Sequence, residues 1–82
     1  MPESPSLTLE TLDPILTEVV QEHRDKVIGW MREEPGCWGF LAGQAVAACR
    51  RSLDRPLEDA ERRLVWSRLW SLLDTIKLRV LG

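Results

Sequence analysis

The stretch that most limits the fold of this chain runs from residue 35 to residue 51, PGCWGFLAGQAVAACRR. A Pro-Gly turn opens it, and no charged residue occurs between Glu34 and Arg50. A helix that is apolar on nearly every side is expected to be buried over most of its surface. We therefore predict a central helix that runs to about Ser52 and is surrounded by the other helices.

On a helical wheel, this segment presents a broad apolar face and, beside it, a stripe of very small residues. Glycine inside a helix costs roughly 1 kcal/mol relative to alanine. Glycines in such a stripe are favoured where another backbone must approach closely, and we expect that here. The apolar face comprises Trp38, Leu41, Ala42, Ala45, Val46 and Cys49, and the small-residue stripe comprises Gly39, Gly43 and Ala47.

An amphipathic helix is predicted before the central segment. Asp13-Pro14 is a strong helix start, because Asp can cap free N–H groups and Pro suits the first turn. The helix ends before Pro35, which disfavours helical geometry in the preceding residue, and a bend near His23 would divide it in two. We predict that residues 1–12 form a flexible leader, with a short ordered turn around Leu7, Leu9 and Leu12 as an alternative for its end. The apolar stripe comprises Leu16, Val19, Val20, His23, Val27, Trp30 and Met31.

A last helix is predicted after the break at residues 53–56, Leu-Asp-Arg-Pro. Glu58 and Glu61 have capping-box spacing at its start. No strand signal or internal repeat is present, so the fold class is all-α. We predict a three-helix bundle, or four helices if the first is broken, around the Gly/Ala-rich central helix, in one domain over residues 13–82. The apolar face of the last helix comprises Val65, Leu69, Leu72, Leu73, Ile76 and Val80.

Trp66, Trp70 and Leu73 give the last helix more than one apolar face. Two interpretations remain open: these side chains wrap the central helix, or they pack against a second copy of the chain. Small domains often gain stability by forming oligomers. We therefore treat these three residues as candidate interface residues and a homodimer as a hypothesis.

The remaining composition argues against several other classes of protein. Cys37 and Cys49 are twelve residues apart and the chain has a single His, which fits neither a zinc motif nor a CxxC redox motif. We expect two buried free thiols in a reducing compartment. The longest uncharged run is too short to cross a bilayer, and the polar N-terminus is unlike a signal peptide. These features predict a soluble, cytoplasmic protein without a membrane partner.

No arrangement of residues indicates catalysis. His23 lies on an apolar stripe, and Ser52, Ser67 and Ser71 lie in or beside helices without the elbow motif of a nucleophile. The glycines near residue 36 lack the spacing of a nucleotide-binding loop. We therefore predict a protein that is not an enzyme and has no metal site, no cofactor and no small-molecule substrate.

The run from Val19 to Gln44 resembles a known helical domain. The residues that carry the resemblance are Val19-Val20, Glu22-His23-Arg24, Val27, Trp30 and the block Gly39-Phe40-Leu41-Ala42-Gly43-Gln44, without a gap. They resemble the C-terminal tail domain of the B subunit of aspartyl/glutamyl-tRNA amidotransferase, which YqeY-type proteins share. The Gly-Phe-Leu-x-Gly-Gln block is the most specific part, and the resemblance covers residues 13 to about 57.

This resemblance implies a non-catalytic module that helps to engage tRNA or a tRNA-handling enzyme. The implied family motif comprises Gly39, Phe40, Leu41, Gly43 and Gln44. On the helical wheel, Phe40 and Gln44 lie away from the main apolar face, where a base could stack, while arginines nearby could hold phosphates. For Phe40, coverage by a neighbouring helix is the other interpretation. The candidate RNA-binding residues are Arg50, Arg51, Arg55, Arg62, Gln44 and Phe40.

The alternative is a small dimeric helical interaction module, or an accessory subunit, that does not bind RNA. Residues 1–36 hold eight acidic and three basic residues, whereas residues 37–82 hold five acidic and eight basic ones. This basic surplus is local and weak for a dedicated nucleic-acid binder. The charge distribution and the Trp-rich last helix favour this alternative, while the family resemblance favours RNA.

Overall fold

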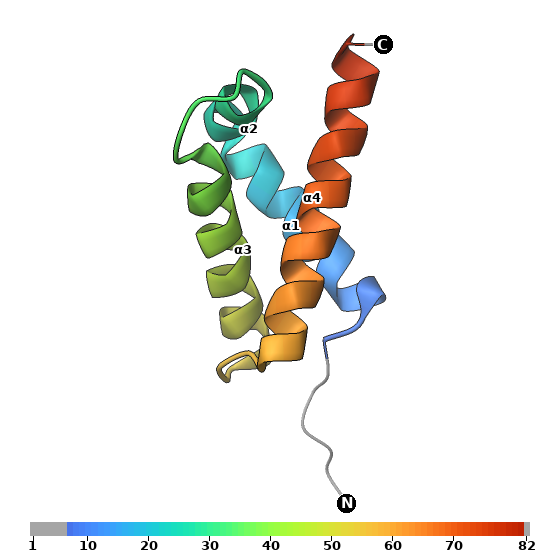
Figure 1. Cartoon of the computed structure of the whole chain (residues 1–82). Coiled ribbons are helices and arrows are strands. Elements are labelled where there is room, and N and C mark those ends of the chain that lie inside the picture. The colour runs from blue at the N-terminus through green and yellow to red at the C-terminus, as the bar shows by residue number, and fades with distance from the viewer. Residues whose placement is uncertain (1–6, 82) are drawn as a thin grey trace, which may run out of the picture.

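Figure 1 shows the computed structural model of the chain, which describes residues 7–81. Over this range the chain forms four helices and no strand. α1 spans Leu9–Glu22, α2 spans Arg24–Met31, α3 spans Cys37–Leu53 and α4 spans Asp59–Leu81. The predicted all-α bundle, with its first helix broken, is therefore confirmed.

α3 and α4 lie side by side in opposite directions, and α1 crosses behind them (Figure 1). α2 lies against the N-terminal end of α3, and the last turns of α4 extend beyond the other helices. The core forms where α1, α3 and α4 meet, with α2 contributing Val27. Its most completely buried side chains are Leu12, Leu16, Leu41, Cys49, Val65, Leu69 and Leu73.

α1 begins earlier than the sequence predicted, so residues 7–12 are not a flexible leader. The Thr8 hydroxyl caps the helix by accepting a hydrogen bond from the N–H of Thr11 at 3.3 Å. Leu7 and Leu12 are both buried in the core, and their burial compensates for the proline inside α1 at position 14. Residues 1–6 of the predicted leader lie outside the described residues.

The predicted bend at His23 is a break between α1 and α2, where His23 has non-helical backbone angles. α2 then ends in a Schellman motif, in which two N–H groups bond back to the last turn. Glu34 donates to the carbonyl of Gly29 at 2.9 Å, and Glu33 donates to that of Trp30 at 3.0 Å. Glu33 occupies the left-handed position of this motif, with φ of 60°.

The predicted break between the last two helices is also confirmed. α3 ends at Leu53 and Asp54 adopts a left-handed conformation. At the start of α4, the Glu61 carboxylate accepts a hydrogen bond from the N–H of Glu58 at 2.9 Å. This is one half of the predicted capping box. The connection brings Arg55 against the same carboxylate.

Two packing predictions need correction. The apolar face of α3 is indeed turned inward, but nothing lies within 4 Å of the position of an added Cβ at Gly39 or Gly43. No helix in the described part of the chain therefore approaches Gly39 or Gly43 closely. In α4, Val65, Leu69 and Leu73 make the buried row, whereas Val80 is 65% exposed. Val80 falls outside the core because the end of α4 extends past the other helices.

Candidate functional site

The open side of α3 forms the floor of a groove between α3 and α4. The groove has a volume of about 560 Å³. Its floor consists of Gly39, Gly43 and Ala47, the small-residue stripe of α3. Because Gly39 and Gly43 carry no Cβ and nothing stands above them, the backbone of α3 is accessible along about one helical turn. We refer to this feature as the α3–α4 groove.

Two tryptophans form the apolar walls of the groove. Trp38 lines it from the first turn of α3, and Trp66 lines it from α4. Trp66 is 43% exposed, and Trp70, one turn further along α4, is 52% exposed. Exposed tryptophans next to an open apolar groove are typical of surfaces that bind other proteins.

The interface residues predicted from the sequence therefore separate in the structure. Trp66 and Trp70 lie on the surface and do not wrap the central helix. Leu73 is completely buried in the core, so the prediction that it is an interface residue is wrong. The physical reason is helix geometry: Leu73 continues the buried row of Val65 and Leu69, and the tryptophans lie about 100° around the helix from that row.

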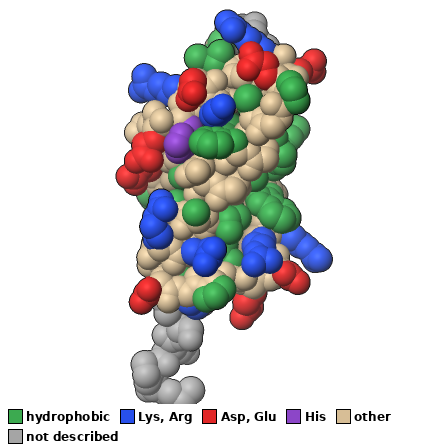
Figure 2. Space-filling view, turned by 90° about the vertical axis from the view of Figure 1, so that its left-hand side faces the viewer, with side chains coloured by type: hydrophobic (Ala, Val, Ile, Leu, Met, Phe, Trp, Pro, Cys, Tyr) green, Lys and Arg blue, Asp and Glu red, His purple; other side chains and the backbone are tan. Residues whose placement is uncertain are grey.

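Two arginines mark one end of the groove. Arg50 comes from the last turns of α3 and Arg62 from the first turns of α4. Arg62 pairs loosely with the exposed Asp59 at 3.6 Å. No ion pair among residues 7–81 involves Arg50. Figure 2 shows basic side chains across the lower half of the α3 side of the molecule.

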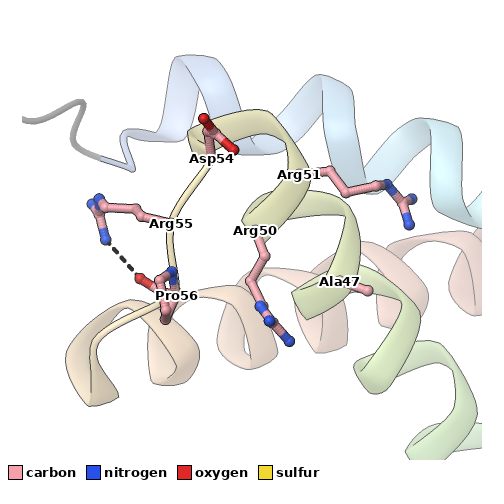
Figure 3. Close-up of a pocket in the computed structure, with 6 residues that line it drawn as sticks. All are labelled: Ala47, Arg50, Arg51, Asp54, Arg55 and Pro56. Carbon is pink, nitrogen blue, oxygen red and sulfur yellow. Dashed lines mark hydrogen bonds between the residues drawn. The ribbon is translucent and has the colours of Figure 1, made fainter.

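Three of the four candidate RNA-binding arginines line one crevice, but their side chains point away from one another (Figure 3). Arg50, Arg51 and Arg55 line a crevice of about 440 Å³ at the α3–α4 connection (Figure 3). Within it the side chains of Arg50 and Arg51 diverge. Arg51 also lines a second crevice, with Glu18 and Glu22 of α1. The helix wheel separates Arg50 from Arg51 by about 100°, which accounts for their divergence.

Arg55 holds the connection between α3 and α4 in place. Its guanidinium makes two hydrogen bonds to the Glu61 carboxylate, at 2.7 and 2.8 Å, and a third to the carbonyl of Pro56 at 3.0 Å. The bond from Arg55, with help from the N–H of Glu58, lowers the pKa of Glu61 to about 2. Two parallel bonds of this kind fix both side chains in place, so Arg55 is not a freely available cation.

Phe40 lies on the other side of α3 from the apolar core face, and its ring is partly covered. The His23 ring makes a T-shaped contact with it, with centroids 5.0 Å apart and planes at 81°. The Lys26 ammonium lies 5.2 Å from the centre of the same ring. Phe40 is 37% exposed and Gln44 is half-buried. The break between α1 and α2 therefore covers part of the surface on which a base was expected to stack, and the rest of the Phe40 ring stays exposed.

The block of residues that carries the family resemblance is divided among three environments. Leu41 is in the core, Gly39 and Gly43 form the groove floor, and Phe40 and Gln44 face the α1–α2 side. A single short motif thus supplies packing, an open surface and a helix contact.

The two cysteines are free and buried, as predicted. Burial, together with the nearby Glu61 carboxylate, raises the pKa of the Cys49 thiol to about 11. Among residues 7–81, no cluster of three metal-ligating side chains is present. No helix in this range is both long and apolar enough to span a bilayer.

The fold thus defines a small all-α bundle with one open, Trp-lined groove. Comparison with protein-family models, with curated proteins and with solved structures found no match to this chain. The resemblance to the amidotransferase tail domain stays a prediction.

Sequence reasoning identified the small-residue stripe but expected it to be covered, and it did not group Trp38 with the candidate site. The signal that was missed is the position of the tryptophans around the axis of α4 relative to its buried residues. Val65, Leu69 and Leu73 are spaced by four residues, so Trp66 and Trp70 must lie beside the buried row. A tryptophan at that position leaves the stripe of α3 open instead of filling it.

Proposed function

We propose that this protein is a non-catalytic helical module that binds another protein helix in the α3–α4 groove. The single observation that carries the proposal is the groove itself: an accessible backbone floor at Gly39 and Gly43 with an exposed tryptophan wall. Helix-in-groove binding uses apolar anchors along one face of the incoming helix. A floor without side chains lets that helix approach closely.

The charged end of the groove defines the chemistry of the partner. Arg50 and Arg62 lie where the flank of a bound helix would pass. A partner helix with Asp or Glu at that flank complements them, and complementary charges fix orientation more than they add affinity. The partner we propose is therefore an amphipathic helix with small and aliphatic anchors and an acidic flank.

Binding to tRNA, which the family resemblance implies, is the competing proposal. It receives less support from the geometry, because Glu61 holds Arg55 and the His23 and Lys26 side chains cover part of Phe40. A surface with fewer available cations releases fewer counterions and binds a polyanion more weakly. RNA binding is therefore one possible outcome of the binding experiment.

The test uses a designed helical peptide of about 16 residues, roughly four turns, with Leu and Ala on one face and Glu on its flanks. Dilute protein is titrated with it, and the Gly39 and Gly43 amide resonances and the tryptophan emission are followed. We expect changes confined to the groove. A peptide with Lys in place of Glu should bind about tenfold more weakly, because like charges then meet at Arg50 and Arg62.

Two variants make this test specific. Gly43→Leu fills the groove at a position where an added Cβ meets nothing, and it should abolish peptide binding. Gln21→Leu adds the same side chain to the exposed surface of α1 and should leave binding intact. The proposal is overturned if the peptide leaves the groove resonances unchanged. Salt-sensitive tRNA binding that is lost in Arg50→Glu/Arg51→Glu would then establish the RNA alternative.

A further inference from the structure

We infer that the helix that fills the α3–α4 groove is α3 of a second copy of this chain, packed antiparallel about a two-fold axis at Gly43. This inference rests on the proposed function, because it names the partner for the same groove. It is carried by two features: the small residues of the floor, which are symmetric about residue 43, and the opposite charges that this register brings near each other.

The small residues have the register that an antiparallel pair requires. In a two-fold pair centred on Gly43, residue 43 of one copy meets residue 43 of the other, and residue 39 meets residue 47. Glycine or alanine occupies all three positions, and all three line the open groove. Residues spaced by four form one ridge of a helix, and two such ridges pack against each other at close range when the side chains are small.

The charges at the two ends of α3 are complementary in the same register. Arg50 stands seven residues after Gly43, which places it opposite Gly36 of the other copy. The turn that leads to Gly36 carries Glu33 and Glu34, both exposed. Arg62 of α4 lies at the Arg50 end of the groove. In this register each basic end of the interface would lie next to the turn that carries Glu33 of the other copy, once on each side of the axis, whereas the Glu34 carboxylate lies against Gly29 of α2.

On the α3 side, Figure 2 shows basic side chains across the lower half of the face, with further charged side chains of both signs above and below them and hydrophobic side chains between. A parallel arrangement of two copies would place the basic ends together, which is unfavourable. The antiparallel arrangement also places Trp38 and Trp66 of each copy beside the α3 of the other, where their exposed apolar surface becomes covered.

The first test is the mass of the chain by sedimentation equilibrium from low micromolar to millimolar concentration. We expect a reversible dimer for the wild-type chain. Gly43→Leu should raise the dissociation constant by about 10- to 100-fold, because a leucine on the axis clashes with its own copy. Gln21→Leu should sediment like the wild type. Helical circular dichroism of Gly43→Leu shows whether the monomer remains folded.

Charge exchange tests the orientation separately. Variant one carries Arg50→Glu and Arg62→Glu, and variant two carries Glu33→Arg and Glu34→Arg. Each alone places like charges at both ends and should dimerise about tenfold more weakly. Mixed in equal amounts, the two variants should form a heterodimer, because each end with reversed charge then faces charges of opposite sign. A mixture that associates no better than either variant would overturn the antiparallel register.

The outcomes separate this inference from the proposed function. If the wild-type chain stays monomeric at millimolar concentration while the acidic peptide still binds the groove, the inference of a second copy is wrong. The proposed helix-binding function is then retained. A monomeric chain whose groove also ignores the peptide overturns both. A dimer that Gly43→Leu does not weaken overturns the groove as its interface.

Discussion

Two glycines of this chain have opposite roles, although both lie in helices. At Gly29 of α2, an added Cβ would lie 2.6 Å from the Sγ of Cys37 and 3.0 Å from a carboxylate oxygen of Glu34. At Gly39 of α3, an added Cβ would meet nothing within 4 Å. Gly29 therefore allows α2 to pack on the start of α3, whereas Gly39 leaves a surface open.

The first prediction compares alanine at these two positions. Gly29→Ala should lower the free energy of unfolding by about 1–2 kcal/mol, since overpacking outweighs the gain in helix propensity. Gly39→Ala should raise it by roughly 0.5–1 kcal/mol. Urea denaturation of dilute protein measures both. The clash is assigned to Cys37 by adding Cys37→Ala, which should remove most of the extra cost of Gly29→Ala; equal costs in both backgrounds would contradict the assignment.

The second prediction concerns the Cys49 thiol. Its pKa of about 11 and its complete burial leave almost no thiolate at pH 8, and the thiolate is the reactive form. Cys49 should therefore react with a disulfide reagent only as fast as the chain unfolds. Reagent kinetics with Cys37→Ser, with and without denaturant, measure this rate. Rapid reaction of native Cys49 at pH 8 would show that this part of the core opens to solvent.

At the scale of elements, the contact between Arg55 and Glu61 joins the α3–α4 connection to the first turn of α4. The folded-state pKa of Glu61, about 2, lies below the ordinary value of 4.5. A lowered pKa means that the folded state favours the charged form. The stabilisation is complete above pH 4.5 and is lost as the pH falls from there toward 2.

The third prediction follows from the lowered pKa of Glu61. The wild-type chain should unfold at higher urea concentration than Glu61→Gln at pH 7, and the difference should shrink steadily between pH 4.5 and 2. Glu18→Gln, which removes an exposed carboxylate without an ion pair among residues 7–81, should not reproduce this pattern. A wild-type advantage that stays constant down to pH 2 would mean that Glu61 is not held by Arg55 in solution.

The fourth prediction tests where α1 begins. Thr8 caps the helix in the structure, so Thr8→Ala should cost about 1 kcal/mol of stability. Asp13 instead pairs with Arg68 of α4 at 3.0 Å, and both side chains are partly exposed, so Asp13→Asn should cost at most about 1 kcal/mol. Thermal unfolding measures both variants. A neutral Thr8→Ala would favour the later start that the sequence alone indicated.

The sequence predicted elements better than it predicted their ends and contacts. Apolar periodicity and the turn at Pro35-Gly36 located every helix, because these signals act within a few residues. Asp13-Pro14 looked like a helix start because both residues favour that position. The burial of Leu7 and Leu12 instead favours an earlier start of α1, and this burial depends on α3 and α4 being in place. The bond between Asp13 and Arg68 joins residues that are 55 positions apart, and no local sequence signal predicts it.

At the scale of the whole molecule, the candidate site is a consequence of how α4 is rotated against α3. The buried row of Val65, Leu69 and Leu73 fixes that rotation and turns Trp66 and Trp70 outward. The sequence contained the floor of the groove in Gly39, Gly43 and Ala47. It could not show that the floor stays open, because the relative rotation of two helices depends on packing throughout the core.

The most direct test of the account is a disulfide cross-link at the axis. Two copies that meet at Gly43 bring their Cα atoms to within disulfide range, roughly 4.4–6.8 Å. Gly43→Cys should therefore form a covalent dimer quickly under mild oxidation, while Gln21→Cys should form one only slowly, and the buried Cys37 and Cys49 should take no part. A Gly43→Cys chain that cross-links no faster than Gln21→Cys would contradict the pairing of two copies through the α3–α4 groove.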